Sequence, residues 1–553
     1  MRRRAGIGLV LVATLVTGCA ALPTSGPVQI GARSETSEEL VLGAQPAPPV
    51  AGASAEQILQ GFLQATLAGG SDGFKVARAY LTETAAEGWD PTAEVAVYPS
   101  GEAPVLAPAA GENQFTLSFL QVGQLSSDGR YSTMPGEKQR VEFTLVQEPA
   151  GWRVDRLPDA VVVPQDVFLN DYVRTVVFFP AAEGQVMVPD VHYFLRNLAA
   201  TAAVQTLLDV PPDYLGPAVS APNAAKARLV TDAVRVDAGR ATVNLSAEVR
   251  RATETERATL AACLVSSLTS IGSVNTVELQ VESAPFDAPE SKLVVDPLAA
   301  EGPYYLGDGG LWRMSGEAAR VPGFEATDGW ETLSVDSSGA RLAALRGGQL
   351  EYIGGPGMPA VSWPVEGTPT SSPVFDTAGR LWLGVAGSVV VYSLEGKASR
   401  LQAPWLAERQ VVGLAPARDG ARLAVLSAAS AGGPARLDVA GIERVEGAPT
   451  GLAGPLKVAS FTGAARSMAW QDHITLALLA PSDNGGQAVQ LVTLGSTVQE
   501  LNAPLDKPTS LTAGRGSEGL YITGEAGGLF HYAPLGAVWT AVATGARSVT
   551  YRS

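Results

Sequence analysis

Residues 54–168 begin with apolar positions at helical spacing and continue with apolar positions at strand spacing. Ser54 and Gln57 have the spacing of a capping box. From Glu94 onward apolar and polar positions alternate, as in QFTLSFLQV, KQRVEFTLVQ and GWRVDRL, which predicts antiparallel strands. Two helical faces precede these strands, with apolar residues Ile58, Leu59, Phe62, Leu63 and Leu67 in the first and Phe74, Ala77, Tyr80 and Leu81 in the second. We predict an N-terminal α+β domain here, of the NTF2-like kind with a curved sheet.

The pattern between residues 169 and 290 changes in the order strand, helix, hairpin, helix, strand. The segment RNLAATAAVQTLLDVPP has the apolar face of a helix that ends at the two prolines, because proline cannot donate the next helical hydrogen bond. The segment DAVRVDAGRATVNLS predicts a hairpin that turns at residues 237–239. Thr253 and Glu256 have the spacing of a second capping box, and Cys263 lies on the apolar face of the helix behind it. We predict a small α/β domain in which Cys263 is a buried hydrophobe.

Short strands and glycine turns fill residues 291–553, with a repeated turn signal. An aspartate comes shortly before a glycine and an apolar strand in LSVDSSGARLAAL, PVFDTAGRLWLGV and LAPARDGARLAVL. The three glycines are Gly339, Gly379 and Gly420, so the copies are 40 and 41 positions apart, which is the length of one four-stranded propeller blade. At this spacing the region holds about six blades. YYLGDGGLWRM and the terminal SVTYRS are candidates for a shared closing blade, and the aspartates are predicted to bind the turn backbone.

The first 18 residues have the three parts of an export signal. Arg2, Arg3 and Arg4 precede a mostly apolar run from Ile7 to Val16, which is too short to span a bilayer. Val16, Thr17, Gly18 and Cys19 resemble the lipobox of bacterial lipoproteins, in which a diacylglycerol group is attached to the cysteine before cleavage at its amino side. This resemblance implies a signal peptide over residues 1–18 and a lipidated Cys19 that anchors the chain to a membrane.

Composition and charge limit the partners of the mature chain. The formal net charge is −16, and loss of the three N-terminal arginines would make it −19. Such an acidic body is repelled by nucleic acid and by anionic head groups, so we expect no nucleic-acid partner and attachment to the membrane through lipid alone. Residues 19–53 are rich in Ala, Pro, Gly and Ser, without periodicity, and are expected to form a tether. With Cys19 acylated, Cys263 has no partner for a disulfide.

The sequence contains no recognisable catalytic or cofactor motif. The three histidines, His192, His473 and His531, are isolated from one another and outside any metal-ligand spacing, so each is expected to have a structural or surface role, and we expect no metal and no cofactor. Residues 69–73 match G-x-S-x-G, but a helix stands before the serine where a hydrolase needs a strand. We therefore expect no catalytic residues and predict that the chain is not an enzyme. The tryptophans of the last domain are predicted to lie in the core between blades, with a sugar-binding surface as the alternative; they are Trp312, Trp330, Trp382, Trp405 and Trp470.

The middle domain resembles a GerMN domain, a small α/β module of exported bacterial proteins, in its VMVPDVHYFL and LLDVPPDYLG segments. Behind a lipobox and ahead of a propeller, this domain order resembles the LpqB lipoprotein family of actinobacteria. The resemblance implies five parts: a signal peptide at 1–18, a lipidated tether at 19–53, an α+β domain at 54–168, a GerMN-like domain at 169–290 and a propeller at 291–553.

The same resemblance implies a function. LpqB-type proteins are accessory factors of the MtrA/MtrB two-component system, and the lipoprotein contacts the extracytoplasmic part of the sensor kinase MtrB. The chain is therefore expected to be a lipid-anchored, extracytoplasmic regulator linked to cell envelope and division. The alternative is a propeller lipoprotein that binds or cleaves cell-wall glycan, for which the channel would need two carboxylates roughly 5 to 10 Å apart.

Overall fold

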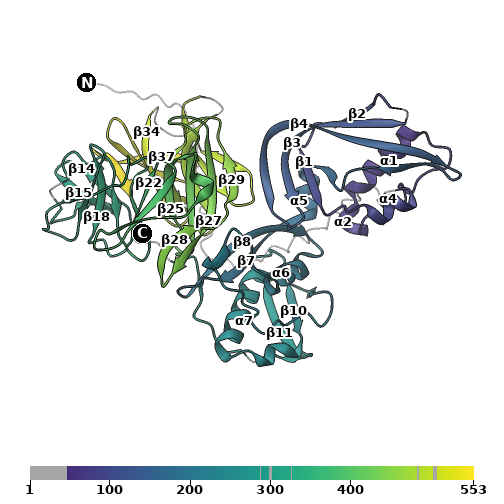
Figure 1. Ribbon diagram of the computed structural model, residues 1–553, viewed down its shortest axis with the longest axis horizontal. Coiled ribbons are helices and arrows are strands. Elements are labelled where there is room, and N and C mark those ends of the chain that lie inside the picture. The colour runs from purple at the N-terminus through teal and green to yellow at the C-terminus, as the bar shows by residue number, and fades with distance from the viewer. Residues whose placement is uncertain are drawn as a thin grey trace, which may run out of the picture. The chain divides into compact units, whose positions relative to one another are not determined.

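The computed structural model describes residues 47–111, 113–286, 288–297, 302–324, 327–482, 485–501 and 507–553. Residues 47–171 form an α+β domain in which four helices precede the sheet (Figure 1). The helices are α1 (Ala55–Leu67), α2 (Gly69–Asp72), α3 (Lys75–Arg78) and α4 (Glu83–Gly88), and α5 (Gln165–Asp171) follows the sheet. Ser54 and Gln57 form the predicted capping box of α1. None of the helices in these described ranges is long and apolar enough to cross a membrane.

The sheet of this domain has the strand order β5-β4-β3-β1-β6, with β2 paired to β3. Its strands are β1 (Glu94–Tyr98), β2 (Val105–Pro108), β3 (Gln114–Ser126), β4 (Tyr131–Glu148), β5 (Gly151–Arg156) and β6 (Val161–Pro164). The pairs β3–β4 and β4–β5 are antiparallel as predicted, whereas β1 and β6 are parallel. Alternate residues of β3 are buried against the helices, which confirms the period-2 pattern.

The second helical face that the sequence predicts is divided in the structure. Ala77 lies within α3, but Tyr80 and Leu81 follow the helix. The Tyr80 carbonyl accepts a hydrogen bond from the Val154 amide at 3.0 Å, so this segment joins the edge of the sheet at β5 and cannot continue the helix. The G-x-S-x-G match at 69–73 falls on the short helix α2 and its C-cap Gly73, where the sequence predicted a flexible turn between helices, and helix α1 precedes it as expected.

Residues 172–297 form an α/β domain with two small sheets. Strands β7 (Tyr172–Pro180) and β8 (Val186–Leu195) pair as a hairpin with β13 (Val294–Val295), and the other sheet has the order β12-β11-β10-β9. The remaining elements are α6 (Ala199–Leu208), η1 (Gly216–Ala218), β9 (Arg235–Asp237), β10 (Arg240–Leu245), η2 (Ala247–Arg251), α7 (Glu254–Thr269), β11 (Thr276–Val281) and β12 (Ala284–Pro285). The predicted hairpin and the Thr253–Glu256 capping box are both confirmed.

The beginning of this domain differs from the prediction, because a hairpin stands where a single strand was expected. Strands β7 and β8 are buried along most of their length, on both faces. Strands buried on both faces lose the apolar and polar alternation by which two strands are told apart in a sequence. The polar turn between Pro180 and Val186 was the remaining signal for the hairpin.

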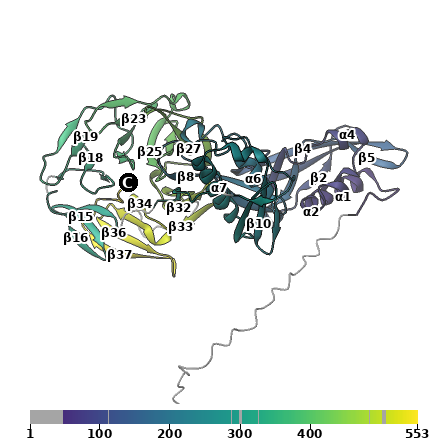
Figure 2. The same ribbon diagram turned by 90° about the horizontal axis from the view of Figure 1, so that it is seen from below.

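Residues 302–553 form a propeller of six blades arranged around a central axis, with the C-terminus near the middle (Figure 2). Blade 1 contains β14 (Tyr304–Gly307), β15 (Gly310–Ser315), β16 (Glu317–Arg320) and β38 (Ser548–Thr550). Blade 2 contains β17 (Ser334–Val335), β18 (Leu342–Arg346), β19 (Gln349–Ile353) and β20 (Val361–Trp363). Blade 3 contains β21 (Val374–Phe375), β22 (Leu381–Val385), β23 (Ser388–Tyr392) and β24 (Ala398–Arg400).

Blade 4 contains five strands, β25 (Gln410–Pro416), β26 (Arg422–Ala428), β27 (Ala435–Val445), β28 (Ala448–Leu452) and β29 (Leu456–Ser460), and the short η3 (Pro404–Leu406) precedes it. Blade 5 contains β30 (Arg466–Trp470), β31 (Thr475–Pro481), β32 (Gln487–Thr493) and β33 (Val498–Leu501). Blade 6 contains β34 (Pro508–Ala513), β35 (Leu520–Gly524), β36 (Gly528–Ala533) and β37 (Val538–Thr544), with η4 (Ser517–Gly519) before β35. The predicted closing blade is confirmed, because β14 pairs with β38 from the chain's other end.

Hydrogen bonds between neighbouring blades, in or beside their innermost strands, close the ring. In most of them a hydroxyl or indole side chain of one blade bonds to the backbone of the next blade. From blade 1 around to blade 1 again, they are Ser553 N to Val335 O, Phe375 N to Ser334 Oγ, Thr370 Oγ1 to Val411 O, Trp470 Nε1 to Ala415 O, Leu511 N to Ser467 Oγ and Val549 N to Ser510 Oγ.

The repeated turns have the structure that the sequence predicts. Asp376 Oδ1 accepts hydrogen bonds from the amides of Ala378 and Arg380 at 3.0 and 2.9 Å, and Asp336 and Asp419 bind their turns in the same way. The turn glycines have φ of 75°, 79° and 69°, a left-handed conformation that favours glycine. Of the five tryptophans, Trp330, Trp382 and Trp470 are buried in the propeller, as expected of blade core.

Candidate functional site

The two predictions about cysteine fall on different parts of the chain. Cys19 and the lipobox residues Val16, Thr17 and Gly18 lie outside the described residues, so lipidation stays a prediction. Cys263 is fully buried on α7, and burial raises the pKa of its thiol to about 12. A thiol in such surroundings stays protonated and unreactive, which agrees with its predicted role as a core residue.

The central channel of the propeller encloses about 170 Å³ and is lined by the innermost strands. Among its described lining residues, Asp376 is the only one with a carboxylate side chain. Asp376 is 4% exposed and already accepts from two turn amides and from Trp382 Nε1, the last at 2.9 Å. This part of the channel therefore lacks the pair of free carboxylates that glycoside cleavage requires.

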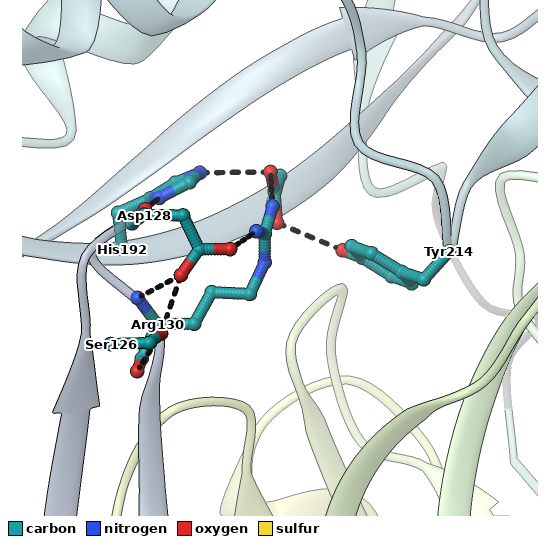
Figure 3. Close-up of polar contacts among 6 residues, drawn as sticks. Ser126, Asp128, Arg130, His192 and Tyr214 are labelled. Atoms are coloured by element: carbon teal, nitrogen blue, oxygen red, sulfur yellow. Dashed lines mark hydrogen bonds and ion pairs between the residues drawn. The ribbon is translucent and has the colours of Figure 1, made fainter.

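A cluster of charged and polar side chains lies where the first two domains meet (Figure 3). We call it the junction; it consists of Asp128, Arg130, Asp190, His192 and Tyr214. Asp190, His192 and Tyr214 are buried, Arg130 is partly buried and Asp128 is exposed. Asp190 Oδ2 accepts from Arg130 Nη2 at 2.7 Å and lies 2.8 Å from His192 Nε2. Tyr214 donates to Asp190 Oδ1 at 3.0 Å, and the Asp190 side chain is completely buried.

The β3–β4 turn, strand β8 and the loop before η1, which carries Tyr214, bring these side chains together. Asp128 and Arg130 lie in and just after the turn between β3 and β4, and Asp190 and His192 lie two positions apart on β8, so their side chains lie on the same face of that strand. Gly129 at the tip of the turn has φ of 79°, and its carbonyl accepts from the Tyr193 amide at 2.7 Å. The backbone of the turn is thereby fixed to β8, next to the charged cluster.

The charges of the junction stabilise the ionised carboxylate of Asp190. Burial by itself would raise the pKa of Asp190, but the His192 and Arg130 charges and the hydrogen bonds outweigh burial, so its pKa lies below the ordinary value. Burial and the nearby Asp190 charge raise the pKa of Tyr214 well above its usual range, and that hydroxyl therefore remains a donor. Asp190 is thus an anion that accepts from Arg130 and Tyr214, with the His192 ring beside it.

The propeller also contacts the residues around the junction. The amide of Gly441 on β27 donates to the Tyr214 carbonyl at 2.7 Å, and the rings of Phe178 and His473 are 5.7 Å apart. Buried apolar residues of the middle domain and of blades 4 and 5 form one continuous core. A cavity of about 20 Å³ beside Arg130 is lined by residues of all three domains, including Val191 and Lys457. The junction therefore lies close to the meeting point of the three domains.

The histidines occupy three different environments. His192 is 2% exposed within the junction, whereas the sequence interpretation treated it as an isolated structural or surface residue. His473 lies at the border between blade 5 and the middle domain, and burial lowers its pKa. His531 is on β36, where its Nε2 lies 2.6 Å from the Glu518 carbonyl. Within the described residues, no group of three potential ligands could hold a metal ion.

Three family profiles match successive parts of the chain. They are "Lipoprotein LpqB, N-terminal domain" at residues 48–169, "Sporulation and spore germination" at 176–287 and "Lipoprotein LpqB beta-propeller domain" at 309–549. The three matches follow the order of the three folded domains.

Several curated relatives, each named Lipoprotein LpqB, match over long stretches. The protein of Cutibacterium acnes is 31% identical over 282 residues, which cover 50% of this chain and 47% of that protein. The protein of Bifidobacterium longum is 26% identical, covering 76% of this chain and 75% of that protein. The protein of Mycolicibacterium smegmatis is 27% identical, covering 79% and 74%. The match thus spans about half the length of the first relative and about three quarters of the other two.

Proposed function

The chain belongs to the LpqB lipoprotein family, and on that premise we propose that it is a membrane-anchored accessory regulator of a sensor histidine kinase of the MtrB type. In this proposal, acyl chains on Cys19 hold the mature chain at the extracytoplasmic face of the cell membrane. The three domains contact the sensor part of the kinase and perform no chemistry themselves. The regulated process is the upkeep and division of the cell envelope.

The observation that carries the proposal is the run of three family domains from residue 48 to residue 549. Two features of the structure support a role in binding. The one side-chain carboxylate found among the channel's described lining residues is saturated with hydrogen bonds, and the thiol of Cys263 is buried. A protein that only binds can still act on a kinase, by binding one of its conformations more tightly than the other.

The proposal can be tested by measuring kinase output in membranes that contain the sensor kinase with or without the full-length lipoprotein. We expect the lipoprotein to change the autophosphorylation rate, with a coupling of about 1 to 3 kcal/mol, or roughly 5- to 150-fold. Soluble sensor domains should also capture the purified mature chain. Failure to bind the sensor domain of any histidine kinase of the host, together with binding to peptidoglycan fragments, would favour the glycan-binding alternative.

Anchoring is tested separately by the substitution Cys19→Ala. Without the thiol no diacylglycerol can be attached, so we expect the variant to move from the membrane fraction to the soluble fraction. Cys263→Ala is the matched control and should remain in the membrane, because that thiol is buried in the folded protein. Retention of the Cys19→Ala variant in the membrane, or a mature N-terminus without fatty acid by mass spectrometry, would contradict lipid anchoring.

A further inference from the structure

Both ring nitrogens of His192 face oxygen atoms at hydrogen-bond distance. Nδ1 lies 2.8 Å from the backbone carbonyl oxygen of Asp128, and Nε2 lies 2.8 Å from Asp190 Oδ2. A carbonyl oxygen can only accept a hydrogen bond, so Nδ1 must carry a hydrogen. The state of Nε2 then depends on whether Asp190 Oδ2 is an acceptor or a protonated donor.

The surroundings of Asp190 require it to be an acceptor. Oδ2 already receives a hydrogen bond from the Arg130 guanidinium at 2.7 Å, and Oδ1 receives one from the Tyr214 hydroxyl. A proton on Oδ2 could only point at His192 Nε2, and the positive charge of the Arg130 guanidinium on the same oxygen opposes it, in agreement with the lowered pKa of Asp190. Asp190 is therefore ionised, and Nε2 of His192 must carry a hydrogen as well as Nδ1. The contacts are complete only when His192 is the doubly protonated imidazolium.

The charge count of the junction agrees with this assignment. The groups that face the ring are Asp190 on the same strand, Asp128 and Arg130 from the β3–β4 turn, and Tyr214 from the loop before η1. Two carboxylates are then balanced by one guanidinium and one imidazolium, and the phenol is neutral. The ring itself stacks on Phe194 at 5.2 Å. With a neutral His192, the fully buried Asp190 carboxylate would have Arg130 as its one cationic partner among the described contacts, and Arg130 is shared with Asp128.

We propose that His192 is a proton-dependent lock between the N-terminal and middle domains, which holds the β3–β4 turn on β8 while its ring is doubly protonated. Loss of one proton to solvent turns a donor into a lone pair that faces the Asp128 carbonyl or the Asp190 carboxylate. Two acceptors then oppose each other at buried side chains, which weakens the contact. Because the bonded state is the protonated one, docking of the turn is strongest at low pH and is lost as pH rises.

The protonation state can be measured directly in the whole mature chain by 15N NMR of the histidine side chains, since the sequence has only three histidines. At pH 7 we expect both ring nitrogens of His192 to show the shifts of protonated nitrogen. The signals are assigned with the variants His473→Gln and His531→Gln. A ring of His192 with a single protonated nitrogen at pH 7 would overturn the proposal.

The consequence for docking can be measured by hydrogen exchange of the amides of residues 126–130 and of Tyr193, corrected for the intrinsic pH dependence of exchange. Between about pH 5 and about pH 9, we expect a range in which the undocked ring has lost its proton and the docked ring still holds it, and there protection should fall by up to about tenfold per pH unit. The blade-turn amides at 376–380 are the internal control and should show constant protection. Constant protection at the junction as well would overturn the proposal.

A variant separates the role of His192 from a general effect of pH. Gln at this position retains a donor but can carry no charge, so His192→Gln should show low and pH-independent protection of the β3–β4 turn. His531→Gln is the matched control, because His531 meets the Glu518 carbonyl and the ring of Tyr521, both within blade 6, and it should keep the wild-type pH profile. If His192→Gln does not fold, the pH profile of the wild-type chain alone decides the question. An unchanged pH profile in His192→Gln would contradict the lock.

Discussion

Buried aspartates stabilise this protein in two regions that differ in where their partners come from. In the blade turns, Asp376 binds the amides of Ala378 and Arg380 and the indole of Trp382, all within six positions along the chain. In the junction, Asp190 binds Arg130, which is 60 positions away, and Tyr214, which is 24 positions away. The first kind of carboxylate shapes one hairpin, whereas the second fixes one domain against another.

The two kinds of carboxylate therefore respond to different changes in the protein. A turn aspartate has neutral amides and its own neighbouring arginine as partners, so its environment changes only if the hairpin itself unfolds. Asp190 depends on a turn that belongs to another domain and on a histidine that can lose a proton. A change in domain contact or in pH therefore acts on the junction and leaves the blade turns intact.

Among the substitutions that test this comparison, we expect Asp190→Ala to lower the free energy of unfolding most. The substitution removes the buried anion that faces Arg130 and His192 and leaves Arg130 with the exposed Asp128 alone, and breaking a buried ion pair from one side costs about 3–5 kcal/mol. The free energy of unfolding, measured by denaturant titration of the transition that includes the junction, should fall by that amount. Asp237→Ala is the control, because its pair with Arg235 is exposed and contributes about 0–1 kcal/mol. Equal losses in the two variants would contradict the distinction between the junction and the surface.

A smaller, strictly local effect is expected from Asp376→Ala in blade 3. The substitution leaves two turn amides and the buried Trp382 indole without their acceptor, and hydrogen bonds to a charged group contribute about 1.5–3 kcal/mol. Hydrogen exchange should accelerate within residues 374–392 and stay unchanged at the β3–β4 turn. Asp376→Asn keeps one acceptor oxygen and should lose less. Faster exchange at the β3–β4 turn in Asp376→Ala would show that the two regions are coupled.

The propeller could be predicted from the sequence because each blade turn is built from neighbouring residues. The spacing of Gly339, Gly379 and Gly420 gave the blade length, and the turn around each aspartate lies within six residues. The capping boxes of α1 and α7 were predictable for the same reason, since their partners are three positions apart. Interactions between residues close in the chain leave a recognisable spacing in the sequence.

The junction could not be predicted in the same way, because its members come from separate domains and no spacing rule connects them. Part of a signal was present: Asp190 and His192 occupy alternate positions of an otherwise apolar strand, so both side chains lie on one face. A buried pair of this kind needs partners, but only the folded chain shows that Arg130 and Tyr214 supply them. The sequence interpretation treated His192 as an isolated residue because these partners could not be identified from the sequence.

The contact between the middle domain and the propeller offers a last test of the same comparison, through Gly441→Ala on β27. A Cβ atom at this position would lie 2.1 Å from the Leu215 carbonyl oxygen, in the loop that carries Tyr214, so the loop and the strand must move apart. Overpacking of this kind costs about 1–3 kcal/mol. Gly454→Ala, where the added atom meets open space, is the control and should change stability by less than about 0.5 kcal/mol. Because the loop also places Tyr214 against Asp190, Gly441→Ala should lower exchange protection at the β3–β4 turn, and a change confined to blade 4 would mean that the propeller and the junction are independent.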